Sequence, residues 1–439
     1  MIVTIPRSAR YLVIGAGVHG LSTAYHLGRR LREEGQGSGA DVVVLEKKRV
    51  GAGASGIACG VVRNFYYQPA MNEIMRISVG VWEEHPDVLG YHPVGYIAAV
   101  PGTQAGDLVS IADCHAKIGY NSEIVTGQKD CDRHMTAILP DFQSEDVEAV
   151  LHEKQGGWAE RDKTVAGLAQ LARGEGVSVL EGVEVTGFDI QGGRVRGVET
   201  SGGHIGAEMV IVAPGPWAAG FWQMLGLPMT VDVQTPDGAA RRPMFTYMKL
   251  QEGEVQTNVD YATAGGGEPP VIHVDHNVPL VSDMTGEVIT TEPWGIYFKR
   301  DAGGVQGGAV PINLGTQVNL EPYGHENPEH VVDESFADYF TAGLARTLDR
   351  FKGRSHSYKQ RPNGGIGAFT PDNFPVFDFM LPNLYFVADS NHGFKMLGVG
   401  KEVANLLTGG TSAALKPFPF SRYADGALHP TSHSPYPWN

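Results

Sequence analysis

The first fifty residues contain a strand pattern, a glycine-rich turn, a helix pattern and a second strand pattern, in that order. Residues 11–14 (Tyr-Leu-Val-Ile) are all apolar, as in a buried parallel strand, and glycines follow at positions 15, 17 and 20. From Val18 onward the apolar residues keep helical spacing, and Gly35 lies where the helix can end. A second apolar run, 42–45, ends at Glu46. This order predicts a βαβ unit with a dinucleotide-binding turn.

The three glycines of this turn have different physical roles. Gly15 permits the tight turn, Gly17 lets the backbone come close to a pyrophosphate, and Gly20 lets the helix pack closely on the strand. Val18 and His19 begin the helix, whose amides and dipole favour an anion. The glutamate at the end of the second strand would accept hydrogen bonds from a ribose. The alternative is a glycine-rich turn without a ligand, but the flanking strands and the terminal acid favour dinucleotide binding.

The composition excludes several classes of function. The 439 residues carry 34 basic and 49 acidic side chains, a formal net charge of −15, without a block of lysines and arginines. Such a chain neutralises a phosphate backbone or an anionic membrane poorly, so we expect neither nucleic acid nor a membrane as partner. The three cysteines have no C-x-x-C spacing, which argues against a disulfide framework and a thiolate metal site. Because no apolar run approaches the length of a membrane span, we expect a cytoplasmic protein.

The patterns also predict how the domains are distributed along the chain. Apolar strand patterns recur at 209–213 and 384–388, far from the first two. We therefore predict an α/β fold with a discontinuous Rossmann-like nucleotide-binding domain and an α+β substrate domain built on an antiparallel sheet. The nucleotide-binding domain would comprise 1–92, 151–227 and 351–425, the substrate domain 93–150 and 228–350, and an irregular tail 426–439.

Two parts of the substrate domain receive a specific interpretation. The segment 231–291 is long and contains the hinge-like glycines 265–267, which favours a lid over the substrate. Within it, the sequence His-Val-Asp-His at 273–276 resembles a metal-ligand set, but two histidines and one acid in a predicted loop are weak evidence. We interpret these four residues as a loop and expect no metal.

A second glycine-rich loop follows the first nucleotide-binding unit. Residues 51–56 read Gly-Ala-Gly-Ala-Ser-Gly, and Val61, Val62 and Arg63 come soon after. Additional backbone donors at this position suit FAD, because its pyrophosphate and isoalloxazine extend further than NAD does in its own fold. FAD is therefore the predicted cofactor, and an NAD-linked dehydrogenase is the alternative.

Four motifs in sequence order resemble the D-amino acid oxidase superfamily of FAD-dependent oxidoreductases, most of all its sarcosine oxidase, glycine oxidase and dimethylglycine dehydrogenase branch. They are the 15–20 turn with the acid at 46, the 53–63 loop, the stretch from 182–185 to 213–217, and the C-terminal segments 369–372 and 391–395. The resemblance covers most of the chain. It implies cofactor contacts from Gly15, Gly17, Val18, His19, Gly20, Glu46, Lys47, Ala54, Ser55, Val185, Ala213, Gly215, Trp217, Gly393, Phe394 and Lys395.

The same resemblance implies a substrate site. Arg63 and Lys395 resemble the cationic pair that holds the substrate carboxylate in sarcosine oxidases, and in a water-excluded pocket they would orient an amino acid over the flavin. The alternatives are a structural ion pair for Arg63 and a solvent-facing position for Lys395. The backbone at Gly393 and Phe394 is expected to enter the helix that continues through 402–407, so that its amides face the flavin edge. His392 is expected to be a core or flavin-side residue without a catalytic role.

The sequence departs from the family at two positions. Monomeric sarcosine oxidases carry a lysine over the flavin that assists oxygen reduction, and the corresponding stretch 303–308 has none. The electron acceptor is therefore expected to be oxygen or another acceptor, such as a dye or a partner protein. The cysteine that anchors FAD covalently in those enzymes is absent before Thr370, so we expect non-covalent FAD, with Cys59 as the one residue that keeps covalent attachment open.

Together these patterns predict an FAD-dependent amine oxidoreductase. The substrate would be a small carboxylate-bearing amine, such as an N-substituted glycine, which is oxidised at the carbon next to nitrogen to an imine that water hydrolyses. No strong base is required, because a bound neutral amine can already transfer hydride. A flavin-binding subunit of a multi-subunit amine dehydrogenase complex is the alternative.

Overall fold

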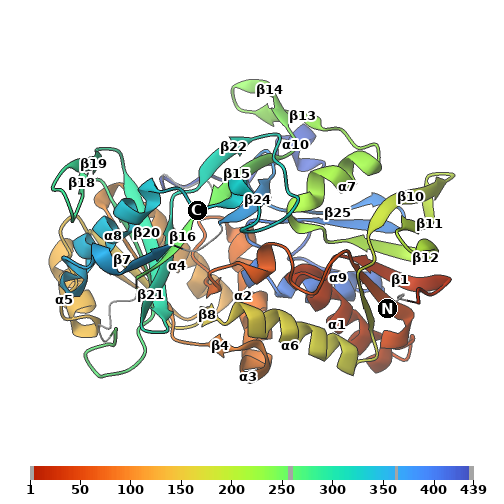
Figure 1. Cartoon of the computed structure of the whole chain (residues 1–439), viewed down its shortest axis with the longest axis horizontal. Helices are drawn as coiled ribbons and strands as arrows, with labels where there is room; N and C mark the ends of the chain where they lie inside the picture. The colour runs from red at the N-terminus through yellow and green to blue at the C-terminus, as the bar shows by residue number, and fades with distance from the viewer. Residues whose placement is uncertain (1–3, 256–260, 361–363, 435–439) are drawn as a thin grey trace.

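Two large sheets organise the molecule (Figure 1). The computed structural model describes residues 4–255, 261–360 and 364–434. In Figure 1 the first sheet, which contains β1, lies on the right, and the second, which contains β7 and β20, lies on the left. The candidate site lies where residues of both sheets meet.

The first sheet has eight strands around a parallel centre. Its members are β1 (Ser8–Ile14), β2 (Val42–Glu46), β9 (Ser178–Glu181), β10 (Val185–Gln191), β11 (Arg194–Thr200), β12 (Gly203–Val212), β25 (Val376–Leu381) and β26 (Leu384–Ala388). Strands β9, β2, β1, β12 and β26 pair in parallel, whereas β10, β11 and β25 pair antiparallel. In β1, Tyr11 and Val13 belong to one hydrophobic core and Leu12 and Ile14 to the other. Burial on both faces explains why residues 11–14 form an unbroken apolar run.

Helices cover both faces of this sheet. On one face, α1 (Val18–Glu33) packs against α6 (Arg161–Gly174) and α9 (Gly398–Leu407). On the other face lies α7 (Ala218–Met224), as Figure 1 shows. The predicted helix from Val18 and the predicted strand ending at Glu46 are both confirmed.

The second sheet also has eight strands and is mixed. Its order is β23 (Tyr358–Gln360), β16 (Glu252–Val255), β21 (Gly304–Ala309), β20 (Trp294–Asp301), β17 (Val271–His276), β5 (Tyr96–Val100), β7 (Ala149–Glu153) and β6 (Ser122–Thr126). Its pairs are antiparallel except β17 with β5. Helices α4 (Ala105–Ile118), α5 (Gln128–Ile138) and α8 (Ser335–Thr347) pack against its strands.

Smaller elements complete the described chain. They are the sheet of β15 (Thr246–Leu250), β22 (Ile312–Gly315) and β24 (Gly365–Phe369), the sheet of β3 (Val61–Val62), β4 (Tyr91–His92) and β8 (Gly157–Ala159), the hairpins β13 (Thr230–Thr235) with β14 (Gly238–Pro243) and β18 (Leu280–Val281) with β19 (Val288–Thr290), and helices α2 (Pro69–Glu84), α3 (Pro86–Leu89) and α10 (Arg422–Asp425). No helix in the described ranges is long and apolar enough to cross a membrane. The domain boundaries stay a prediction.

The lid predicted for 231–291 is wrong for its described part. That segment forms β13 to β19, and three of its strands, β15, β16 and β17, belong to larger sheets. Residues 256–260 of the segment lie outside the described residues. The glycines 265–267, interpreted as a hinge, lie in a turn between β16 and β17.

The loop predicted for 273–276 is also wrong. These residues end β17, which is buried along its whole length and hydrogen-bonded to strands on both sides. The polar side chains His273 and Asp275 of this strand are buried because they satisfy one another, which a local pattern does not reveal. In the structure His273 and Asp275 lie two residues apart on one face of the strand, and they bond to each other at 2.8 Å.

Candidate active site

A cavity of about 460 Å³ opens at the carboxyl ends of the parallel strands of the first sheet. Residues that directly follow β1, β2, β12 and β26 line it, including Gly15, Lys47, Ala213 and Asp389. The second sheet contributes its opposite wall, for example Tyr297. Crevices outside the carboxyl ends of parallel strands are where open α/β sheets bind their ligands.

The cavity brings together nearly all of the predicted site residues. Its lining contains Gly15, Gly17, Val18, His19, Glu46, Lys47, Ala54, Ser55, Arg63, Val185, Ala213, Gly215, Trp217, Gly393, Phe394 and Lys395. Gly20 is the exception, because it lies behind the turn, where a Cβ would approach the carbonyl oxygen of Gly15 to 1.9 Å.

The geometry of the first turn fits the pyrophosphate of FAD. Gly15 has a φ of +101°, and a Cβ there would lie 2.4 Å from the carbonyl oxygen of Ala213. A Cβ on Gly17 would lie 3.1 Å from Oγ of Ser55, a residue that also lines the cavity. At the end of β2, Glu46 Oε2 accepts a hydrogen bond from the backbone N–H of Ala16 at 3.1 Å. A turn without side chains lets backbone N–H groups approach a pyrophosphate, and a carboxylate at the end of β2 can accept from a ribose. Both are features of dinucleotide-binding folds.

Alanine substitutions at the two glycines should separate fold from cofactor binding. Gly17→Ala should keep the fold but weaken FAD binding roughly tenfold, because its methyl group occupies space over the turn and displaces Ser55 Oγ. Gly20→Ala should lower stability, because its methyl group meets backbone rather than a movable side chain. Thermal unfolding and the flavin content of the purified protein measure the two effects. If Gly17→Ala still contained a full complement of flavin at limiting FAD, the turn would not be the binding site of the pyrophosphate.

Arg63 and Lys395 meet around one aromatic ring at the far end of this lining. The Arg63 guanidinium carbon lies 4.9 Å from the ring centroid of Tyr66, and Lys395 Nζ lies 5.7 Å from the same centroid. Arg63 is buried, is held by the backbone carbonyl of Phe65, and also contacts the ring of Tyr96 at 5.7 Å. Two cations so close together favour an anion between them, since each raises the free energy of the other's charge.

The protonation states at this end are strongly shifted. Burial, and then the nearby charge of Arg63, lower the pKa of Lys395 from 10.5 to about 7. Behind Arg63, burial raises the pKa of Glu153 to about 8, although the N–H of Asn64 and the hydroxyl of Tyr120 each donate to it at 2.8 Å. Glu153 was not singled out in the sequence, because nothing local distinguishes it from an ordinary strand acid.

A line of three hydrogen-bonded side chains leads from the cavity into the second sheet. Tyr96 and His273 both line the cavity, and Tyr96 Oη lies 2.7 Å from His273 Nδ1. His273 Nε2 lies 2.8 Å from Oδ1 of Asp275, which is fully buried. When His273 donates from Nε2 to Asp275, its Nδ1 accepts from the Tyr96 hydroxyl. We refer to Asp275, His273 and Tyr96 as the relay.

A buried aspartate joins the two chain segments on the cofactor side. Asp389 bonds His19 Nε2 at 3.0 Å and His392 Nδ1 at 3.2 Å. Although burial opposes it, these hydrogen bonds hold the pKa of Asp389 well below its ordinary value. His19 lines the cavity, whereas His392 is a core residue that stacks on Phe374. The sequence motifs contained both histidines but not their common partner.

The helix predicted to begin at Gly393 begins later. Gly393–Lys395 form a separate 3₁₀ turn, and α9 starts at Gly398. The prediction extended the apolar helical pattern too far toward the N-terminus, since Gly393 and Phe394 are cavity-lining residues of the turn before the helix. Any polarisation of a ligand here comes from backbone of the turn, not from the first turn of α9.

Comparison with known proteins decides the family. The model for DAO, "FAD dependent oxidoreductase", matches residues 10–406. The chain belongs to the DAO family of FAD dependent oxidoreductases. The predicted family and the prediction of an FAD-dependent oxidoreductase are thereby confirmed.

Several DAO-family relatives are similar to the chain. Sarcosine oxidase subunit beta of Rhizobium meliloti is 26% identical over 50% of this chain and 53% of its own length, and the Rhodobacter capsulatus subunit is 27% identical over 46% and 49%. The chain thus spans about half the length of these curated relatives in the matched region. The Arthrobacter subunit is 23% identical over 96% of this chain and 93% of its own length.

Solved DAO-family structures confirm the predicted fold class. L-proline dehydrogenase from P. horikoshii superposes with a TM-score of 0.75 at 20% identity, covering 97% of this chain and all of the other. Glycine oxidase from Geobacillus kaustophilus gives 0.67 at 17% identity, covering 95% and 99%. The first sheet with its parallel centre and the mixed second sheet are therefore the DAO-family arrangement.

Next to the DAO-family cavity lies a second cavity that holds Lys299. Cys59 lines both cavities, and its N–H donates to Glu252 Oε1 at 2.9 Å. Gln306, which lies in the stretch without a lysine, donates to Glu252 Oε2 at 3.2 Å. Lys299 Nζ lies 4.1 Å from the ring centroid of Trp158 and belongs to the lining of the second cavity, not of the first.

Proposed function

We propose that the chain oxidises a carboxylate-bearing amine, an N-substituted glycine or another amino acid, at the carbon next to nitrogen. The observation that carries this proposal is the placement of Arg63 and Lys395 around Tyr66, in the same cavity as the glycine turn. A carboxylate between the buried Arg63 and the half-buried Lys395 gains charge-assisted hydrogen bonds and a fixed orientation. Relatives named sarcosine oxidase subunit beta and 4-methylaminobutanoate oxidase have names that fit this class of substrate.

FAD, when bound, supplies the hydride acceptor of the reaction. The chain's own residues bind and orient the substrate and exclude water from it. They also move a proton. A bound ammonium donates to Tyr96 Oη, the Tyr96 hydroxyl hydrogen passes to His273 Nδ1, and the charge of Asp275 stabilises the imidazolium that results. The amine is then neutral, and loss of a hydride from the carbon next to nitrogen leaves an iminium ion, which water hydrolyses to a carbonyl compound and a protonated amine.

We also infer that FAD is held without a covalent bond. The segment 365–369 before Thr370, where the resemblance would place a covalent anchor, contains no cysteine, and Cys59 is buried in the cavity lining with its backbone N–H bonded to the carboxylate of Glu252. Heat precipitation of the protein should therefore release unmodified FAD into the supernatant.

A panel of amines tests the proposed substrate class. Under anaerobic conditions N-methylglycine, glycine, proline and N-methyl-4-aminobutanoate should be compared with the amide of each, and bleaching of the flavin absorbance should be recorded. We expect at least one acid to bleach the flavin and its amide to do so far more slowly. Equal bleaching by acids and amides would remove the carboxylate from the proposal.

The alternative function is that of a flavin-binding subunit. Three relatives are named as beta subunits, which is the observation that favours it. Turnover of a panel substrate by the purified single chain would argue for an independent enzyme. Bleaching without turnover, restored by a partner chain, would argue for a subunit.

Reoxidation by oxygen should be slow. Positive charge beside the flavin stabilises the negative charge that develops on oxygen, and the resemblance places the family's lysine in the stretch 303–308, which has none. Gln306 of this stretch lines the second cavity and reaches the first through Glu252, to which it donates at 3.2 Å. Gln306→Lys should therefore accelerate reoxidation, on the order of tenfold. Stopped-flow mixing of reduced protein with air-saturated buffer measures both rates. A wild type that already reacts as fast as the variant would show that another cation, such as Lys299, has this role.

A further inference from the structure

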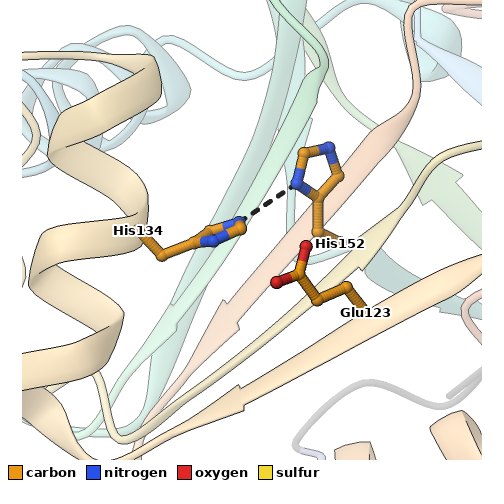
Figure 2. A group of neighbouring side chains, drawn as sticks. All are labelled: Glu123, His134 and His152. Atoms are coloured by element: carbon orange, nitrogen blue, oxygen red, sulfur yellow. Dashed lines mark hydrogen bonds between the residues drawn. The ribbon is translucent and has the colours of Figure 1, made fainter.

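Three potential metal ligands lie close together at the second sheet (Figure 2), and none of them lines either cavity. Glu123 on β6 and His152 on β7 are directly opposite each other in the antiparallel pair, so their side chains share one face. His134 extends from α5, which packs over these two strands. We propose that Glu123, His134 and His152 bind a divalent transition-metal ion, for which Zn²⁺ is the best fit.

The distances suit such an ion. One ligand atom from each residue lies within 4.8 Å of the other two. His134 Nε2 and His152 Nδ1 are 3.1 Å apart, close to the edge of roughly 3.3 Å that Zn–N bonds of ~2.0 Å give in a tetrahedron. A small rotation of the Glu123 side chain closes the remaining gap. Two imidazoles and one carboxylate are a ligand set that Zn²⁺ prefers and Mg²⁺ does not.

A lysine ammonium group already occupies the space between two of the ligands. Lys154 Nζ lies 2.9 Å from both Glu123 Oε2 and His152 Nδ1, so an ammonium group now contacts two of the three ligands. The Lys154 side chain is 35% exposed and can turn away into solvent. Zn²⁺ would replace this ammonium, with water in the open position.

Rigid elements hold all three ligands. Two come from neighbouring strands in fixed register and the third from the middle of a helix, so the chain loses little freedom when the ion binds. None of the three lines either cavity. The ion would therefore link α5 to β6 and β7 and raise thermal stability without taking part in amine oxidation.

Titration of the chelator-treated, FAD-containing protein with Zn²⁺ tests this site. With a competing chromophoric chelator, we expect one high-affinity Zn²⁺ per chain and a higher Tm with the ion bound. His134→Ala and His152→Ala should each weaken binding roughly tenfold or more and abolish the Tm shift. Amine oxidation need not be measured, so failure of this proposal is distinguishable from failure of the proposed function.

Two further variants make the result specific. Lys154→Met should bind Zn²⁺ several-fold more tightly than wild type, because no ammonium competes for Glu123 and His152. His204→Ala is the matched control, since His204 is exposed on β12 and faces Asp189 at 3.7 Å but belongs to no group of three potential ligands among the described residues. Unchanged affinity in His134→Ala, weaker binding in Lys154→Met, or an equal loss in His204→Ala would each overturn the proposal.

Discussion

Replacing Lys395 with methionine should lower kcat/KM for the acid substrate by a factor on the order of a hundred to a thousand. Loss of a charge-assisted hydrogen bond in a desolvated pocket costs ~2 to 4 kcal/mol, and methionine fills a similar volume. Arg63→Met should behave in the same way, and the double variant should lose less than the sum, because both cations contact one carboxylate. Lys401→Met is the matched control, since Lys401 is an exposed lysine on α9 paired with Glu84. Its kinetics should equal those of wild type.

The same substitution has a distinct pH signature. Below pH ~7 Lys395 is protonated and attracts a carboxylate; above it the charge is lost, because its pKa lies at about 7. The Kd of a carboxylate inhibitor that has no amine, such as acetate, should therefore rise with pH above 7 in the wild type. This rise should disappear in Lys395→Met and move to higher pH in Arg63→Met, where the neighbouring charge is gone.

An amide analogue of the substrate separates two roles of Lys395. If the lysine holds the carboxylate, the wild type should oxidise the amide with a low kcat/KM, and Lys395→Met should change that kcat/KM little. If Lys395→Met lowers kcat/KM for the amide as much as for the acid, Lys395 acts on the flavin. The proposal that the substrate carries a carboxylate would then be wrong.

The nucleotide-binding half of the site could be predicted because its signals are local. The turn at 15–20 and the acid at 46 lie within one βαβ unit, where glycine chemistry and apolar periodicity determine the structure. Family motifs then extended the prediction to distant segments such as 213–217 and 391–395, which the fold brings to the same cavity. Here the resemblance supplied the long-range information that periodicity lacks.

The substrate side could not be predicted in the same way. His273 and Asp275 satisfy each other inside a central strand, and a sequence pattern cannot tell such a pair from an exposed polar loop. Burial raises the pKa of Glu153 against the opposing effects of Asn64, Tyr120 and Arg63, and both the burial and these neighbours depend on the tertiary fold. Buried polar residues whose partners are distant in the chain are where local reasoning fails.

The relay gives the other large expected effect. Asp275→Asn should lower kcat/KM near neutral pH by about a hundredfold, since general-base catalysis commonly contributes 10²–10⁴-fold. Asparagine keeps the shape of the side chain but no longer stabilises an imidazolium at His273. Without the relay, the substrate reacts only in the fraction that binds as free amine.

The pH profile distinguishes this role from a structural one. The deficit of Asp275→Asn should shrink as the pH approaches the pKa of the substrate ammonium, because the neutral amine then needs no relay. Tyr96→Phe should give the same profile, and the double variant should lose little more, because the two residues act in one proton path. Arg63 and Glu153, which also act electrostatically on Tyr96, are retained in both variants. A deficit of equal size at every pH would mean that Asp275 supports the strand alone, and the proton path through Tyr96 would then have to be abandoned.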